Sequence, residues 1–110
     1  MKNVKTLKFT ASWCKPCQVL ATQLEGEEMT TYDIDDASSR DALKKYQVRN
    51  VPTLIFIEED EKGNTTELHR HRGVIGKEDY RKLVDALANE KVNPEYQEVV
   101  ERIGSPQVKE

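Results

Sequence analysis

The sequence has few cysteines, few aromatic residues and no long apolar segment. Only two of the 110 residues are cysteine, and they lie three positions apart, too close for a disulfide between them to constrain a useful loop. No apolar run is long enough to cross a bilayer, and the lysines in the opening MKNVKTLKF are not followed by the apolar segment of a secretory signal. We therefore expect one small domain located in the cytoplasm.

The charges of the chain nearly balance. Its 17 Lys and Arg residues and 20 Asp and Glu residues give a formal net charge of −3. Nucleic acids and anionic membrane surfaces attract proteins that carry a broad positive field. We therefore expect neither a nucleic-acid partner nor a membrane partner.

Hydrophobic periodicity predicts an α/β fold with a four-stranded mixed sheet. The elements follow in the order β-α-β-α-β-β-α, with one further helix at the end. The most apolar strand is expected in the centre of the sheet and the most charged one at its edge, where charge discourages unwanted pairing. Strands are predicted over residues 4–11, 29–34, 51–57 and 65–72, and helices from Pro16 to about Gly26, after Ser38 or Ser39, and over 77–90.

The last part of the chain carries helix signals of its own. Asn93 followed by Pro94 is typical of a helix start. The apolar residues that follow recur at helical spacing, namely Tyr96, Val99, Val100 and Ile103. We expect a domain over residues 1–91 and a helical extension over 92–110 that packs on it.

The two cysteines lie in the segment Trp13-Cys14-Lys15-Pro16-Cys17, where a strand gives way to a helix. One cysteine just before the helix and another one turn later on the same side bring two sulfurs within reach. Unpaired backbone N–H groups and the helix dipole favour a thiolate at Cys14, and Lys15 adds a positive charge. Because the thiolate is the attacking species, we predict that Cys14 is the nucleophile and Cys17 the resolving cysteine.

Together with Val51-Pro52-Thr53 some 35 positions beyond Cys17, this motif resembles the thioredoxin family over roughly residues 4–90. The resemblance implies a thioredoxin-like three-layer fold and a thiol-disulfide oxidoreductase that reduces protein disulfides, with no bound cofactor and no metal. It also implies a cis peptide bond before Pro52 and a docking role for Val51, whose backbone would hydrogen-bond an extended substrate. The rest of the implied substrate-binding surface consists of Trp13, Lys15, Pro16, Gly73 and Val74.

Three features depart from the family pattern. The chain begins almost at the motif strand, so the family's leading strand and helix are missing, and we expect the helix after Pro94 to cover the sheet face left bare. Lys8 stands where thioredoxins usually bury an aspartate that helps to deprotonate the resolving cysteine, and Thr31 stands where that aspartate's lysine partner would lie. We expect Lys8 to modulate the reaction by slowing resolution at Cys17. Alternatively, water or a nearby carboxylate would deprotonate Cys17 in place of the missing aspartate. Thr22 replaces a helix-kinking proline, which predicts a straighter helix.

A C-x-x-C pair is also half of many zinc sites, which His69 and His71 would have to complete. The proline between the cysteines, the preceding tryptophan and the long separation along the chain argue against zinc. We interpret the segment His69-Arg70-His71-Arg72 as a solvated edge strand in preference to a docking patch.

The direction of the redox reaction stays open at this point. Alternatives are a glutaredoxin-like, glutathione-dependent reductase, a disulfide isomerase or oxidase, and a non-enzymatic interaction module that uses the groove around Trp13, Val51 and Gly73. A cytosolic setting favours reduction. By resemblance, electrons would come from a flavin-dependent thioredoxin reductase that uses NADPH, ribonucleotide reductase would be among the clients, and the protein would act as a monomer.

Overall fold

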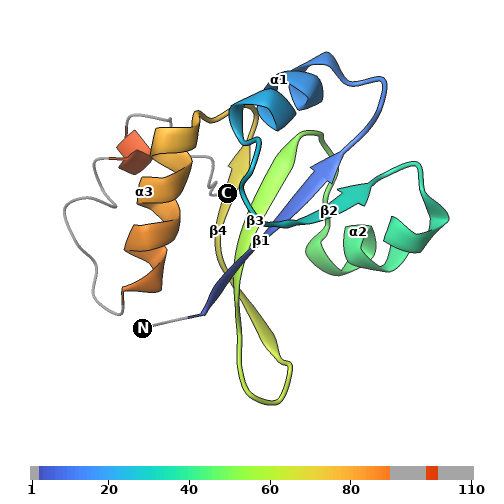
Figure 1. Ribbon diagram of the computed structural model, residues 1–110. Helices are drawn as coiled ribbons and strands as arrows, with labels where there is room; N and C mark the ends of the chain where they lie inside the picture. Colours follow the sequence, from blue (N-terminus) through green and yellow to red (C-terminus); the bar gives the residue numbers. More distant parts are fainter. Residues whose placement is uncertain (1–2, 90–98, 102–110) are drawn as a thin grey trace.

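The computed structural model describes residues 3–89 and 99–101. Its sheet has the strand order β2-β1-β3-β4, with β1 parallel to β2 and β3 antiparallel to both β1 and β4 (Figure 1). The predicted α/β architecture with a four-stranded mixed sheet is confirmed. No helix within the described ranges is both long and apolar enough to span a membrane. In chain order the elements are β1 (Val4–Thr10), α1 (Lys15–Gln23), β2 (Thr30–Asp33), the 3-10 turn η1 (Ala37–Ser39), α2 (Arg40–Tyr46), β3 (Thr53–Glu59), β4 (Thr65–Arg72) and α3 (Lys77–Ala88).

The strand β3 is covered on both faces. Its residues from Thr53 to Ile57 are all buried, and it lies between β1 and β4. Leu54 and Phe56 belong to the core on one side of the sheet, and Ile55 belongs to the core on the other. A strand with two covered faces appears in the sequence as a continuous apolar run, so the predicted inner position of this strand is confirmed.

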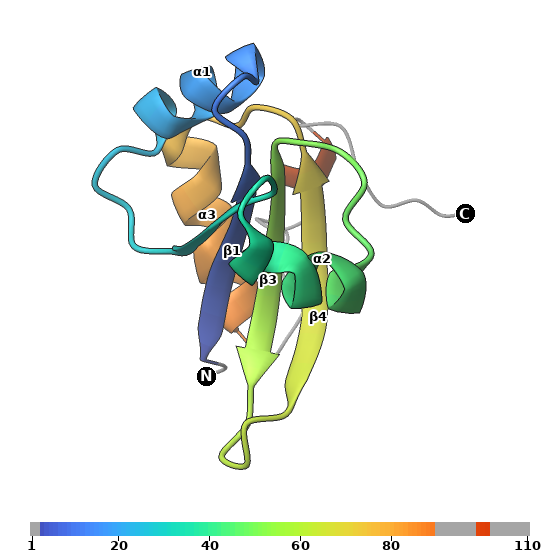
Figure 2. The same cartoon turned by 90° about the vertical axis from the view of Figure 1, so that its right-hand side faces the viewer.

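The sheet separates two hydrophobic cores and so creates three layers. Figures 1 and 2 show α3 on one side of the sheet and α2 on the other, with α1 across one end of the α3 side. The larger core lies between the sheet and the pair α1 and α3, and includes Leu20, Leu24, Leu54, Phe56, Ile75, Tyr80, Leu83 and Leu87. The smaller core, on the α2 side, includes Leu7, Phe9, Ile55 and Ile57, with Leu43 and Tyr46 of α2 packed against it.

The strand β4 lies at the sheet edge as predicted, but two of its side chains are buried in the core. His69 and His71 are only 3% and 4% exposed. Both lie on the side covered by α1 and α3, since they pair with the β3 residues that face that core. Side chains alternate between the two faces of a strand, so the imidazoles enter the core while Arg70 and Arg72 point the other way. The interpretation of this segment as a solvated edge is wrong for the two histidines, whereas Arg72 is exposed.

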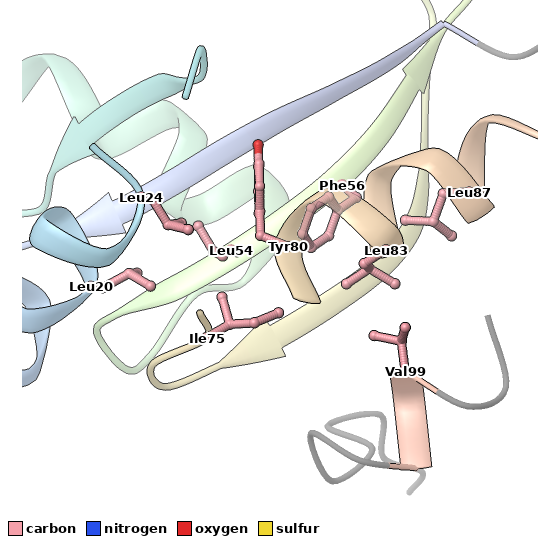
Figure 3. Packing of buried hydrophobic residues seen from close by; sticks show 9 residues of the cluster. All are labelled: Leu20, Leu24, Leu54, Phe56, Ile75, Tyr80, Leu83, Leu87 and Val99. Carbon is pink, nitrogen blue, oxygen red and sulfur yellow. The ribbon is translucent and has the colours of Figure 1, made fainter. Parts of the chain in front are cut away.

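Part of the C-terminal region joins the larger core. Of the helix predicted after Pro94, residues 99–101 lie in the described part of the chain, and they are helical. Val99 is fully buried and packs with the α3 residues Leu83 and Leu87 (Figure 3). The rest of the predicted extension, including its boundary after residue 91, lies outside the described residues.

Candidate active site

Cys14 lies at the junction between β1 and α1. The chain turns at Ser12 and Trp13, and the extended backbone of Cys14 (φ −94°, ψ 112°) makes it the N-cap of α1. Pro16 lies in the first helical turn, where its missing N–H removes no helical hydrogen bond. The backbone N–H of Cys17 donates a hydrogen bond to Cys14 Sγ at 3.2 Å. The fold therefore places this sulfur where unpaired amides and the helix dipole favour negative charge.

The two cysteines are joined by a disulfide, and their Cα atoms are 5.2 Å apart. Both side chains are almost fully buried, Cys14 being 5% and Cys17 3% exposed. They form a small cluster with Ala11, against which Ile34 and Val51 pack. The pair is therefore held together in a mostly apolar setting, and only a small part of either sulfur reaches the surface.

Two loops from distant parts of the chain flank the disulfide. The peptide bond between Val51 and Pro52 is cis, as the resemblance implied. Cys14 Sγ lies 3.7 Å from the backbone oxygen of Val51. The backbone N–H of Gly73, whose φ of +104° suits glycine, donates to the backbone oxygen of Pro52 at 3.0 Å. The cysteine turn, the loop before β3 and the loop after β4 therefore meet at one end of the sheet.

Trp13 stands at the surface beside this junction. Its side chain is 66% exposed, which is high for a large apolar group. The indole Nε1 donates a hydrogen bond to Asp35 Oδ2 at 2.8 Å. Asp35 follows β2, which is parallel to β1, so both residues lie beyond the carboxyl ends of neighbouring strands. Sequence reasoning did not identify Asp35 as a site residue, because its place beside Trp13 depends on the pairing of β1 with β2.

A hollow of about 410 Å³ lies next to the cysteine turn. Its apolar lining includes Trp13, Ile34, Leu43, Val48 and Val51. A larger hollow of about 800 Å³ lies between the start of β1 and α3, with Val4, Tyr80 and Val84 in its lining. We place the candidate site at the smaller hollow, because Trp13 and Val51 in its lining adjoin the disulfide, whereas the lining of the larger hollow contains no residue of the cysteine turn.

The other predicted site residues divide into two groups. Lys15 and Pro16 are exposed on the first turn of α1, and Val74 is 42% exposed after Gly73, so all three surround the disulfide. Lys8 instead lies within β1, half-buried and paired with Leu54 and Thr31. Within residues 3–89 and 99–101, the side chain of Lys8 makes no hydrogen bond or ion pair. The strand position therefore carries an amine in place of a carboxylate, and no carboxylate of the described residues pairs with it.

The two buried histidines do not extend the cysteine pair into a metal site. Across the part of the chain that the structure describes, no three His, Cys, Asp or Glu side chains are grouped to hold a metal ion. Burial, together with a smaller effect of the nearby His71, lowers the pKa of His69 to about 4, although the charge of Glu67 acts in the opposite direction. Burial also lowers the pKa of His71, whose hydrogen bond to the Val74 backbone acts in the opposite direction. Both imidazoles are therefore neutral at pH 7.

Comparison with known proteins assigns the family. The thioredoxin family model matches residues 2–88. This chain belongs to the thioredoxin family. A curated thioredoxin from Staphylococcus epidermidis is 36% identical over 67 residues, which cover 54% of this chain and 62% of that protein. The Bacillus subtilis thioredoxin is 31% identical over 66 residues, covering 54% of this chain and 64% of that protein. The chain thus spans about three fifths of the length of these thioredoxins.

Solved thioredoxins share the fold. Thioredoxin-2 of the malaria parasite, described as a component of its protein secretion machinery, superposes with a TM-score of 0.61 at 25% identity and covers 76% of this chain and 82% of its own. The Thermus thermophilus thioredoxin has the same TM-score at 17% identity, covering 76% and 72%. The expected thioredoxin-like fold is therefore confirmed for this chain.

Proposed function

We propose that this thioredoxin-family chain is a thiol-disulfide oxidoreductase that reduces protein disulfides through Cys14 and Cys17. The observation that carries the proposal is the position of Cys14 Sγ, which caps α1, accepts the Cys17 N–H and lies within bonding reach of the second sulfur. For thioredoxins as a family the nucleophile has a pKa of about 7. Compared with a free thiol near 8.5, that difference corresponds to about 2 kcal/mol in favour of the thiolate.

The proposed reaction has two exchange steps. In the first, the Cys14 thiolate attacks one sulfur of the substrate, the substrate S–S bond breaks and a mixed disulfide forms while the other substrate sulfur leaves as a thiolate. In the second, the Cys17 thiolate attacks Cys14 Sγ and releases the remaining substrate thiol. The chain is left with the Cys14–Cys17 disulfide, having passed two electrons to the substrate. An external dithiol must then reduce this disulfide before the next turnover.

Substrate binding is proposed for the surface around the disulfide. An extended substrate segment would hydrogen-bond the backbone of Val51, beside Pro52 and the Gly73–Val74 loop, with Trp13 and Lys15 at its other side. The 3.7 Å approach of Cys14 Sγ to the Val51 oxygen supports this placement, because a strand held there would bring its sulfur to Cys14. The exposure of Trp13 and Val74 supports it too, since exposed apolar side chains often mark interaction sites.

We propose that Lys8 slows the second step. A carboxylate near a buried thiol can accept its proton, whereas an ammonium group cannot. Lys8 is half-buried and has no acidic partner among the residues that the structure describes, so this position supplies no base for Cys17. Water or another carboxylate would have to accept that proton.

The electron donor separates the leading proposal from its alternatives. We propose that a flavin-dependent thioredoxin reductase, which uses NADPH, is the electron donor. The acceptors are protein disulfides, with ribonucleotide reductase among the proposed clients. We also propose that the protein is cytoplasmic and monomeric. Insulin reduction should be measured with a thioredoxin reductase and NADPH, and separately with glutathione as the donor. Activity with the reductase supports the proposal, and activity with glutathione alone favours a glutaredoxin-like role.

Cys14→Ser should abolish turnover, and retained function after replacing both cysteines would favour a non-enzymatic interaction module.

The equilibrium reduction potential of the cysteine pair tests the direction of the reaction. A value near the thioredoxin figure of about −270 mV supports reduction, whereas a value near −120 mV supports an oxidase. Cys17→Ser should trap the mixed disulfide with substrate, which would show directly that Cys14 is the attacking sulfur.

A further inference from the structure

Two consecutive residues of β4 contact the loops on either side of the disulfide. Arg70 and His71 point to opposite faces of the sheet, because neighbouring strand residues alternate. The strand ends at Arg72, directly before the Gly73–Val74 loop. Neither Arg70 nor His71 takes part in the dithiol exchange proposed above, and their segment was expected to be a solvated edge.

Arg70 binds the end of α2. Its Nη2 donates to the backbone oxygen of Tyr46 at 2.6 Å, and its Nη1 to that of Gln47 at 3.5 Å. The last carbonyl groups of a helix have no partner within the helix, and a cation there is favoured by the helix dipole. Gln47 leaves the helix in a left-handed conformation (φ 53°, ψ 51°) and leads into the loop that carries Val51. Arg70 therefore fixes the point where that loop begins.

Glu67 holds the guanidinium of Arg70 in this position. Two parallel hydrogen bonds join the groups, from Nε to Oε2 at 2.8 Å and from Nη2 to Oε1 at 2.9 Å. Paired bonds of this kind fix the plane of the guanidinium as well as its distance. The Arg70 side chain is only 16% exposed, so solvent screens the contact less than at an open surface.

His71 binds the second loop from the other face of the sheet. Its Nε2 lies 3.2 Å from the backbone oxygen of Val74. Because a carbonyl oxygen only accepts, the neutral imidazole must carry its proton on Nε2 for this hydrogen bond to form. The neighbouring Gly73 N–H donates to the Pro52 oxygen. A displacement of Val74 would therefore also disturb the contact between the two loops.

We propose that Arg70 and His71 are positioning residues that fix the two substrate-binding loops from opposite faces of β4. Arg70 acts through the carbonyls of Tyr46 and Gln47, and His71 through the carbonyl of Val74. This inference rests on the proposed reduction of protein disulfides, since it assigns these loops to the binding of the substrate strand. Small disulfides do not need an ordered groove, so the effect should be confined to protein substrates.

The first test separates binding from chemistry. Arg70→Gln and His71→Leu should each raise KM for insulin disulfides roughly 10-fold, because small misplacements of a binding group are costly. Their rates with hydroxyethyl disulfide should stay within about twofold of wild type, since Cys14 and α1 are untouched. His71→Gln should restore most of the loss, because its side-chain amide still offers an N–H donor. Arg70→Lys should restore less, because an ammonium group cannot form the paired contact with Glu67.

Arg81→Gln provides the matched control. The Arg81 guanidinium also pairs with a carboxylate, that of Glu27 at 2.8 Å, but it lies on α3 and holds no loop beside the disulfide. This variant should leave KM for insulin unchanged. If it raises KM as much as Arg70→Gln does, or if neither Arg70→Gln nor His71→Leu raises KM, the positioning role is contradicted.

A second measurement does not depend on activity. Amide hydrogen exchange at Gly73, whose N–H binds the Pro52 oxygen, should become about 10-fold faster in His71→Leu and stay unchanged in Arg81→Gln. Unchanged exchange in His71→Leu overturns the inference. Failure of the wild-type protein to reduce insulin would instead contradict the proposed function, and the exchange rates would still decide the positioning role. If His71→Leu or Arg70→Gln fails to fold, His71→Met and Arg70→Met, which keep an extended side chain but donate no hydrogen bond, carry the same comparisons.

Discussion

Asp35 orients the Trp13 side chain, which stands next to Cys14 in the sequence and at the surface. The 2.8 Å hydrogen bond from Trp13 Nε1 to Asp35 Oδ2 joins the cysteine turn to the loop after β2. It holds a side chain that is otherwise free to move, because Trp13 is 66% exposed and packing alone does not restrain it. Trp13 forms one edge of the proposed substrate groove, so the shape of this edge depends on Asp35.

Removal of this carboxylate should loosen Trp13. Asp35→Ala should shorten the rotational correlation time of the indole and raise KM for insulin about 3-fold, in keeping with a net hydrogen-bond contribution of about 0.5–1.5 kcal/mol. Trp13 is the one tryptophan in the chain, so its fluorescence anisotropy decay reports on this side chain alone. Asp35→Asn keeps an acceptor oxygen and should behave nearly as wild type. An unchanged anisotropy decay in Asp35→Ala would show that the bond does not orient the indole.

Lys8→Asp should accelerate the second exchange step. A carboxylate on this half-buried strand position would accept the Cys17 proton, which the wild-type ammonium group cannot do. General-base assistance contributes about 100-fold or more in favourable geometry, so an increase of about 10-fold or more is expected. The measurement is acid quenching followed by mass spectrometry of the mixed disulfide. Lys8→Asn removes the lysine without adding a base and should not accelerate resolution; equal rates in wild type and Lys8→Asp would contradict the role given to Lys8.

Val99→Ala should destabilise the protein by about 2 kcal/mol, because it removes two methyl groups from a fully buried site and leaves a cavity. Val100→Ala is the matched control, since Val100 is only half-buried and should cost less. Urea unfolding measures both variants. Deletion of residues 92–110 should likewise lower Tm sharply. Equal stability of Val99→Ala and wild type would mean that Val99 does not contribute to the core formed with Leu83 and Leu87.

Acid should destabilise the fold through His69. Its pKa falls from 6.5 in the unfolded chain to about 4 in the folded protein, so the unfolded state binds a proton first as the pH falls. The contribution of His69 to the free energy of unfolding should therefore be complete above pH 6.5. It should decrease between pH 6.5 and about 4, by up to about 3 kcal/mol in total. Urea unfolding at pH 7 and pH 5 should show a clearly smaller difference for His69→Gln, which does not titrate. Identical pH dependence in both proteins would contradict this assignment.

The parts of the fold set by local chemistry were predictable from the sequence. The proline in Trp13-Cys14-Lys15-Pro16-Cys17 marks the first turn of α1, and the apolar run of β3 indicates a strand covered on both sides. The helix predicted over 77–90 is observed as Lys77–Ala88, since its apolar residues recur at helical spacing. The start of α2 after Ser39 was also predicted, although the capping hydrogen bond in this region joins Asp36 to the Ser38 N–H of the preceding 3-10 turn and Ser39 makes no such bond.

The errors arose where tertiary packing decides the outcome. Alternation in β4 shows that His69 and His71 share a face, but the position of α3 determines that this face is buried. The contact between Trp13 and Asp35 likewise depends on the pairing of β1 with β2. Neither pairing nor packing can be read from the spacing of residues within one strand.

The acidity of Cys14 in the reduced protein tests the whole account most directly. The rate of alkylation by iodoacetamide should be followed from pH 4 to 10, with peptide mass spectrometry to separate Cys14 from Cys17. The position of Cys14 at the amino end of α1 predicts a midpoint well below the ordinary thiol value of about 8.5, near the thioredoxin figure of about 7. A midpoint at or above 8.5 would contradict the claim that the helix amino end activates this sulfur.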